Sequence, residues 1–395
     1  NTTASGPQSH AEGSNTLASS NSSHAEGEYT TASGIYSHAE GNSTRATGEQ
    51  SHAENGGTLA QGDNSHAEGG ATSAIGNQSH SEGQLTTAQG AASHSEGYNT
   101  KANADYSHSE GINTTASGVF SHAEGGNTTA SDVASHAEGN NTISSNEATH
   151  AEGVSTTASG YGSHSEGVST TSSGNGSHAE GNNTKATGQY SHSEGGSTIA
   201  SGQFSHAEGN TTTAYGDYSH AEGSNTTAIG SMGHAEGRET TASGNFGSHA
   251  EGEYTIASGV GSHAEGGASI ASGLHAHAEG LYTTSEGNSS HAEGSFTTAS
   301  GDYSHTEGQS NYAFGKNSHA GGFSSNALGE NSFIHSSGST VSGIRSVVLG
   351  GKSITGSAND TVYMPKIELA ETGGSIIMKS PDGTRSVSYT HLRAH

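Results

Sequence analysis

The sequence contains no cysteine and only 3 prolines among its 395 residues. Without cysteine, no disulfide framework can hold the chain together. The scarcity of proline and the lack of a three-residue period exclude a collagen triple helix in spite of 62 glycines. Hydrophobic residues make up 27% of the chain and aromatic residues 5%, which is too little for the cores of ordinary globular domains.

Basic residues are also scarce, since 11 Lys and Arg stand against 38 Asp and Glu. This balance argues against a nucleic-acid-binding surface, so no nucleic-acid partner is expected. No apolar run is long enough to span a bilayer, so no membrane insertion is expected in this chain. A formal charge of −27 with low hydrophobicity would normally indicate disorder, but a strict internal repeat overrides that expectation.

The repeat is built on the pentapeptide Ser-His-Ala-Glu-Gly, first seen at Ser9–Gly13. Its histidine recurs every 14 residues from His10 to His234 and, after one extra residue, in the same step from His249 to His319. A second half of the form Thr-x-Ala-x-Gly completes each unit. Both halves alternate small and variable residues, as short strands do, and the residue pairs between them have turn chemistry. The unit therefore predicts one coil of an all-β, narrow parallel β-solenoid with 14-residue coils and two strands per coil.

Three positions in each half stay small in almost every repeat. A 14-residue coil has room only for small side chains between its two sheets, so we place these positions inside the solenoid. The other second-half positions vary freely, which is typical of a face turned to solvent. In the first repeat the interior positions are Thr2, Ala4, Gly6, Ser9, Ala11 and Gly13.

The remaining face carries the histidine and the glutamate. The histidine is present in 23 coils and the glutamate in 22 of them, Gly321 being the exception. A solvated strand face would not keep such identities, so we expect this face to pack against the same face of another copy as an inter-chain ladder. Near the C-terminus the same positions turn apolar, at Phe333, Val347 and Leu349. Representative ladder residues are His10, Glu12, His24, Glu26, His38, Glu40, His122, Glu124, His206, Glu208, His291 and Glu293.

Repeated Ser, His and Glu also suggest a hydrolase. Neighbours on a strand such as Ser9 and His10 point to opposite faces, however, whereas a nucleophile and its base must lie within hydrogen-bond reach. We therefore expect no catalytic residue and no enzyme. His-x-Glu does place both side chains on one face, as a metal site requires, but divalent ions stacked about 4.8 Å apart would repel strongly. The preferred interpretation is hydrogen-bonded pairing of imidazole with carboxylate, within or between chains, with no metal or cofactor.

Buried carboxylates are costly unless they are paired. The pairing therefore predicts that glutamate raises the pKa of the repeat histidines and keeps them protonated near neutral pH. Stability would then be lost as the pH rises through the raised pKa.

Two further surfaces were weighed. Threonine rows on a solenoid suggest ice binding, but Arg45, Leu59 and Lys101 interrupt the array. Aromatic residues such as Tyr36 and Phe120 precede the serine of the motif in many coils. They would cover the edge of a seam between chains or stack on glycans.

The segment Ser346–Gly350, Ser-Val-Val-Leu-Gly, is similar to the Ser-Val-Ala-Ile-Gly repeat of YadA-like heads in trimeric autotransporter adhesins. The Ser-His-Ala-Glu-Gly repeat resembles a polar version of it, also found in tail fibres of bacteriophages and prophages. The resemblance covers residues 1–356. It implies a left-handed parallel β-roll whose three chains lie side by side, or intertwine, about a three-fold axis as a fibre.

The resemblance also implies a structural role. The first expectation is the shaft of a phage tail fibre presenting a host-attachment tip; the alternative is a bacterial cell-surface trimeric adhesin or extracellular filament protein. The implied location is the virion, the cell surface or the extracellular space. The implied partners are further copies of the chain and a host surface receptor, glycan or protein, bound through regions outside this sequence.

Three segments are expected: a repeat shaft over 1–356, a C-terminal β segment over 357–385 leading to a missing tip or chaperone domain, and a tail over 386–395 that resembles translated sequencing adapter. Strands are expected at 361–365 and 375–378. Because the chain begins at Asn1 inside a repeat, the natural N-terminus is expected to be missing.

Overall fold

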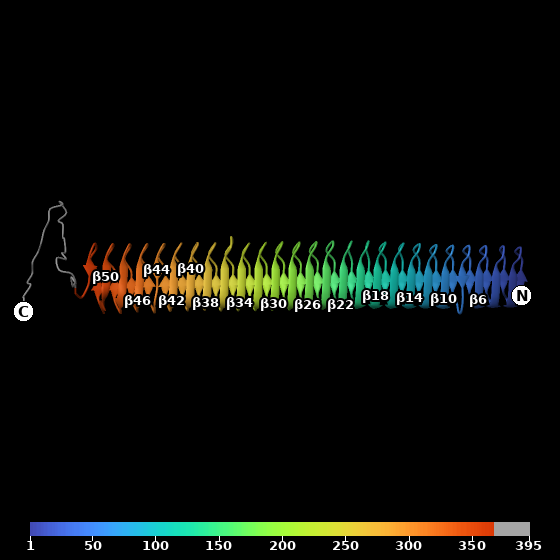
Figure 1. The fold of residues 1–395 in the computed structure, drawn as a ribbon, viewed down its shortest axis with the longest axis horizontal. Helices are drawn as coiled ribbons and strands as arrows, with labels where there is room; N and C mark the ends of the chain where they lie inside the picture. The colour runs from blue at the N-terminus through green and yellow to red at the C-terminus, as the bar shows by residue number, and fades with distance from the viewer. Residues whose placement is uncertain (367–395) are drawn as a thin grey trace, which may run out of the picture.

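The computed structural model describes residues 1–366, which form a long rod with the N-terminus at one end (Figure 1). The 52 strands run across the rod axis, 26 in each of two sheets. Every even-numbered strand from β2 (His10–Ser14) to β46 (His319–Phe323) begins at a repeat histidine and has five residues, except β8 (His52–Ala53) and β44 (His305–Thr306), which have two. The odd-numbered strands, beginning with β1 (Thr3–Ala4), have two residues each. Within 1–366 no helix is long and apolar enough to cross a membrane.

Each strand pairs in parallel with its counterpart in the next coil. β2 pairs with β4 (His24–Glu28), which sets His10 opposite His24 and Glu12 opposite Glu26. The extra residue before His249 is absorbed in a turn, since β34 (His234–Arg238) and β36 (His249–Glu253) pair in register. The all-β parallel solenoid with 14-residue coils and two strands per coil is confirmed.

The interior is lined by the small residues that the repeat predicts. In the second coil Ala18 and Ala25 are fully buried, as are Thr16 and Ser23. The equivalent residues of the first coil are more exposed because no coil covers them on one side. Near the C-terminal end of the rod the interior side chains become larger and more hydrophobic, since Ile334, Val341 and Val348 take the buried positions.

Glycine is required after each glutamate for a reason different from the one predicted. It was expected inside the solenoid for its small size, but Gly27 is half-buried and has a φ of +112°. Gly139 has a φ of +107°, and a Cβ there would lie 2.1 Å from the carbonyl oxygen of Gly153. Left-handed backbone and contact with the next coil, rather than interior volume, exclude a side chain.

The turns between the strands are also stacked from coil to coil. Each contains a residue with positive φ, and most of these are not glycine, for example Ser22 at 54° and Tyr29 at 58°. The backbone N–H of Ser22 donates to the carbonyl oxygen of Pro7 at 2.8 Å, and that of Tyr29 to Ser14 at 2.9 Å. Inter-coil hydrogen bonds therefore hold a backbone conformation that these residue types seldom adopt.

The paired strands continue past residue 356. β50 (Val347–Lys352) pairs with β52 (Val362–Tyr363), which is the strand expected at 361–365. The strand expected at 375–378 and the tail at 386–395 lie outside the described residues.

The glycine constraint can be tested by Gly139→Ala with Gly126→Ala as the matched control. Gly126 ends β18 (His122–Gly126), and a Cβ there meets only the Asn140 amide nitrogen at 3.1 Å. We expect Gly139→Ala to destabilise its coils by about 3 kcal/mol and Gly126→Ala to change them by less than about 0.5 kcal/mol. Amide hydrogen exchange of the flanking coils measures both, and equal protection loss in the two variants would contradict this account.

Candidate functional site

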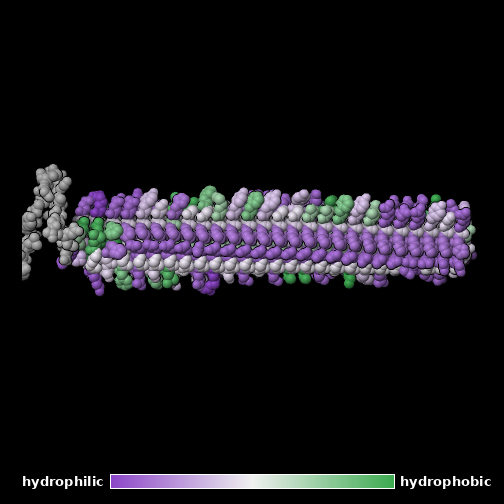
Figure 2. All heavy atoms as spheres, in the orientation of Figure 1, coloured by the Kyte–Doolittle hydropathy of each residue, from purple (hydrophilic) through white to green (hydrophobic). Residues whose placement is uncertain are grey.

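The repeat histidines form one continuous stack along the rod. From His24 to His305 successive rings lie nearly parallel, with centroids between 4.6 and 5.0 Å apart. At His122 and His136 the centroids are 4.8 Å apart and the planes 1° apart. The cause is the in-register parallel pairing of the strands, which repeats at about the same spacing. Figure 2 shows hydrophilic side chains in unbroken rows along the rod.

A row of glutamates runs beside the histidines. The His Nε2 to Glu Oε2 distance within a coil ranges from 3.3 Å at His94 and Glu96 to 3.9 Å at His24 and Glu26. In a typical inner coil about 35% of each side chain is exposed. The Nε2 atoms themselves are buried from His24 to His319 and have no hydrogen-bond partner among the described residues. Within one chain the pair is a close contact without hydrogen-bond geometry, and hydrogen-bonded pairing with another chain stays a prediction.

The structure brings the predicted ladder residues together in two adjacent rows. Their contact with another chain stays a prediction. The rows contain His10, Glu12, His24, Glu26, His38, Glu40, His122, Glu124, His206, Glu208, His291 and Glu293, on β2, β4, β6 (His38–Asn42), β18, β30 (His206–Asn210) and β42 (His291–Ser295).

The prediction that glutamate raises the histidine pKa is wrong for this chain. Burial lowers the pKa of His122, and the stacked imidazoles of His108 and His136 lower it further, while Glu110 and Glu138 oppose them. Burial is the largest cause, and the stacked imidazoles add to it because charging one opposes charging the next. Burial also lowers the pKa of His38, His52, His66, His94, His136, His164, His178, His206, His249, His263, His291 and His319.

Some of the stacked carboxylates show the opposite shift, although the pKa of Glu279 is lowered by hydrogen bonds with Glu293 and Glu265. A hydrogen bond with Glu68, then burial and the nearby Glu40, raise the pKa of Glu54 to about 7. Burial raises the pKa of Glu124 and Glu194 as well. Like charges at coil spacing make it favourable for some carboxyls in the row to keep a proton.

The serines are placed where they cannot act as nucleophiles for these histidines. Ser37 is buried, and its Oγ donates to the carbonyl oxygen of Gly34 at 2.7 Å. His38 follows it on β6 and lies in the outer row. The predicted separation of Ser and His on opposite faces is confirmed.

The ladder ends in apolar residues, as the sequence indicates. Phe333 stacks on His319 with centroids 4.6 Å apart, and Leu349 is 41% exposed. Val347 lies beside them, half-buried and paired with Phe333 in the neighbouring strand. A hydrophobic patch is visible at this end of the rod in Figure 2.

The coil of His319, in which Gly321 stands in place of the glutamate, admits a contact that sequence reasoning missed. His335 Nδ1 lies 3.5 Å from Glu307 Oε1, which is also 3.4 Å from His319 Nε2. A Cβ at Gly321 would be 2.6 Å from His335 Nδ1, so a longer side chain there would exclude this arrangement. The signal in the sequence was the loss of glutamate one coil before His335.

Exposed aromatic residues form short stacks on the turns. Tyr190 and Phe204 have centroids 5.2 Å apart, and Phe204 and Tyr218 5.1 Å. A further pair is Tyr106 and Phe120, at 5.1 Å. The stacks follow the turn positions with positive φ, and their predicted role at a seam or on glycans stays a prediction.

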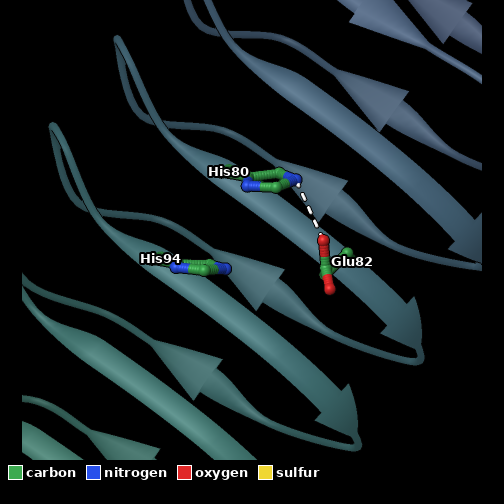
Figure 3. Close-up of side chains that lie close together, drawn as sticks. All are labelled: His80, Glu82 and His94. Carbon is green, nitrogen blue, oxygen red and sulfur yellow. Dashed lines mark ion pairs between the residues drawn. The ribbon is translucent and has the colours of Figure 1, made fainter.

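Histidines of adjacent coils also share a glutamate between them. His80, Glu82 and His94 each offer one ligand atom, and these atoms all lie within 4.8 Å of one another (Figure 3). The His-x-Glu motif in the sequence indicates two of these three residues, the histidine and the glutamate of one coil. The third comes from the next coil and is set by stacking.

The fold is a rod of parallel 14-residue coils with rows of polar side chains on its outer face. Such a fold is typical of a structural protein. The YadA head domain repeat matches residues 1–19, 109–131, 193–219, 207–232 and 250–276. The chain therefore carries YadA-like head repeats, and its fold is of the structural adhesin type rather than that of an enzyme family. No curated protein matches the chain.

The lowered histidine pKa values predict acid sensitivity. Since the folded-state pKa lies below the ordinary histidine value of 6.5, stability is present above pH 6.5 and is lost as the pH falls through the lower folded values. NMR titration of the imidazole Cε1 protons should give titration midpoints below pH 6.5 for the inner coils. The urea concentration at half-unfolding should be lower at pH 5 than at pH 7. Midpoints above 6.5 would restore the charged-ladder interpretation.

Glu54→Gln tests the carboxylate row. Because the pKa of Glu54 is raised to about 7, the stability it contributes at low pH is lost as the pH rises through that value. The substitution should therefore raise the unfolding temperature at pH 8 and leave it nearly unchanged at pH 4. The control is Glu147→Gln in an exposed turn, for which we expect no pH-dependent gain.

Proposed function

We propose that the chain is the rod of a homotrimeric, left-handed β-roll fibre at a cell surface, of the trimeric adhesin type. The observation that carries this proposal is the outer ladder, which keeps its histidines and glutamates in register along the rod and half-buries them within a single chain. Their Nε2 atoms have no hydrogen-bond partner from His24 to His319 within 1–366. A second and third copy would cover the roughly one-third of each side chain that a single chain leaves exposed.

The apolar end of the ladder supports the same arrangement. Phe333 and Val347, half-buried, and Leu349, exposed, continue the rows. Apolar side chains left partly open to solvent favour contact with an identical face. The rod would act as a stiff spacer, because every coil is hydrogen-bonded to the next through both sheets.

The matched repeat favours a surface adhesin over the phage tail-fibre shaft that was the first expectation. The matched repeat is described as a YadA head domain repeat, which supports a location outside the cell. We assign no receptor to the rod itself.

Mass measurement tests the assembly. Light scattering of the purified chain in EDTA should give three times the chain mass of 39.3 kDa. A species of 39.3 kDa throughout the micromolar range would contradict the trimer.

Phe333→Asp probes the position of the seam, with Phe314→Asp as its control. Phe314 is 50% exposed and follows β45 (Tyr312–Ala313) in the other sheet. A charge at Phe333 should weaken assembly at least tenfold, or about 1.4 kcal/mol, whereas the same charge at Phe314 should not. Equal behaviour of the two variants would place the seam elsewhere.

A further inference from the structure

We propose that the ladder is a multivalent binding site for divalent transition-metal ions of the zinc class, each held by the histidines of two adjacent coils and the glutamate between them. The proposal goes beyond the fibre role and does not rest on it, because all three ligands come from one chain.

The ligand geometry is nearly formed at His80, Glu82 and His94. The Nε2 of His80 lies 3.4 Å from Glu82 Oε2, and the two rings are 4.9 Å apart and 11° from parallel. Ligand atoms about 2.0–2.1 Å from a tetrahedral zinc are about 3.4 Å from one another. The distance from His80 Nε2 to Glu82 Oε2 already has this length. A small rotation of the rings would bring the third ligand, His94, to the same distance. Figure 3 shows the rings one above the other with Glu82 beside them.

The imidazole nitrogens are available to an ion. Nε2 is buried and without a hydrogen-bond partner in every repeat histidine from His24 to His319, within the described part of the chain. A buried polar atom without a partner is costly, and a metal would satisfy it.

Overlap between sites sets the stoichiometry. The group formed by His108, Glu110 and His122 shares His122 with the group formed by that residue, Glu124 and His136. Neighbouring groups cannot both be filled, so one ion takes two coils. Ions are then about two ring spacings apart, beyond a Debye length of about 8 Å. Two coils also bring two carboxylates, which balance one divalent charge. Alternate filling thus removes the repulsion expected for an ion in every coil.

The donor set distinguishes this site from the general attraction of an acidic surface for cations. Two imidazoles and one carboxylate suit zinc, cobalt or nickel, whereas calcium and magnesium prefer oxygen ligands throughout. Calcium in excess should therefore leave a zinc-loaded ladder nearly unchanged.

The first experiment titrates ZnCl2 into the EDTA-treated full chain by calorimetry at pH 7.5. We expect about eleven ions per chain, half the number of repeat histidines, and at least tenfold weaker binding at pH 5.5. Cobalt should give the intense visible bands of tetrahedral coordination. Absence of zinc binding at micromolar concentration, or its loss to equimolar calcium, would overturn the proposal.

Two variants with the same composition test adjacent-coil chelation. One replaces alternate histidines, His80, His108, His136 and His164, by Asn. The other replaces consecutive ones, His80, His94, His108 and His122, by Asn.

The alternate variant leaves isolated histidines and should lose about four ions, whereas the consecutive variant should lose about two. Equal losses would mean that single imidazoles bind and would overturn the site. If either variant fails to fold, the cobalt spectrum and stoichiometry of the unchanged chain still decide. Zinc binding by a chain that scatters as a monomer in EDTA would support this site and contradict the trimer alone.

Discussion

Parallel backbone hydrogen bonding between coils, in register at a 14-residue period, is the interaction on which the rest of the structure depends. The N–H of His24 donates to the carbonyl oxygen of Ser37 at 2.8 Å, and that of Leu17 to Thr30 at 2.9 Å, and the pattern recurs along the rod. Because the strands of adjacent coils pair in register, each side chain lies over the equivalent side chain of the next coil. Alanine columns, imidazole stacks and carboxylate rows are all consequences of this register.

Stacking imidazoles on imidazoles and carboxyls on carboxyls has an electrostatic cost, which contributes to the pKa shifts on the outer face. Burial and the neighbouring imidazoles lower the pKa of His122, and a hydrogen bond with Glu68, burial and the nearby Glu40 raise the pKa of Glu54 to about 7. Both responses lower the charge of the rows. Contact with another chain and coordination of metal ions would each relieve the same two problems, unpaired Nε2 atoms and repeated like charge. The two proposals therefore concern one surface but can be tested separately.

The narrow coil also decides what kind of function the protein can have. Its interior is filled by Ala, Ser and Thr side chains, so the repeat region encloses no space for a substrate, and the serines are turned inward. All distinctive chemistry lies outside, in rows as long as the rod. Such a surface suits recognition that repeats along its length, by an identical chain or by a series of ions, and agrees with the adhesin-type repeats that the chain carries.

The sequence by itself determined the period, the two strands per coil, the separation of serine from histidine, and the buried positions other than the glycine after each glutamate. Alternation within a strand fixes the face of each side chain without knowledge of any distance. The tertiary structure alone decided the sign of the histidine pKa shifts, the reason for Gly139, the contact of Glu307 with His335 and the joining of His80, Glu82 and His94. Each of these depends on residues one or two coils away, and only the stacking of coils sets how closely such residues approach.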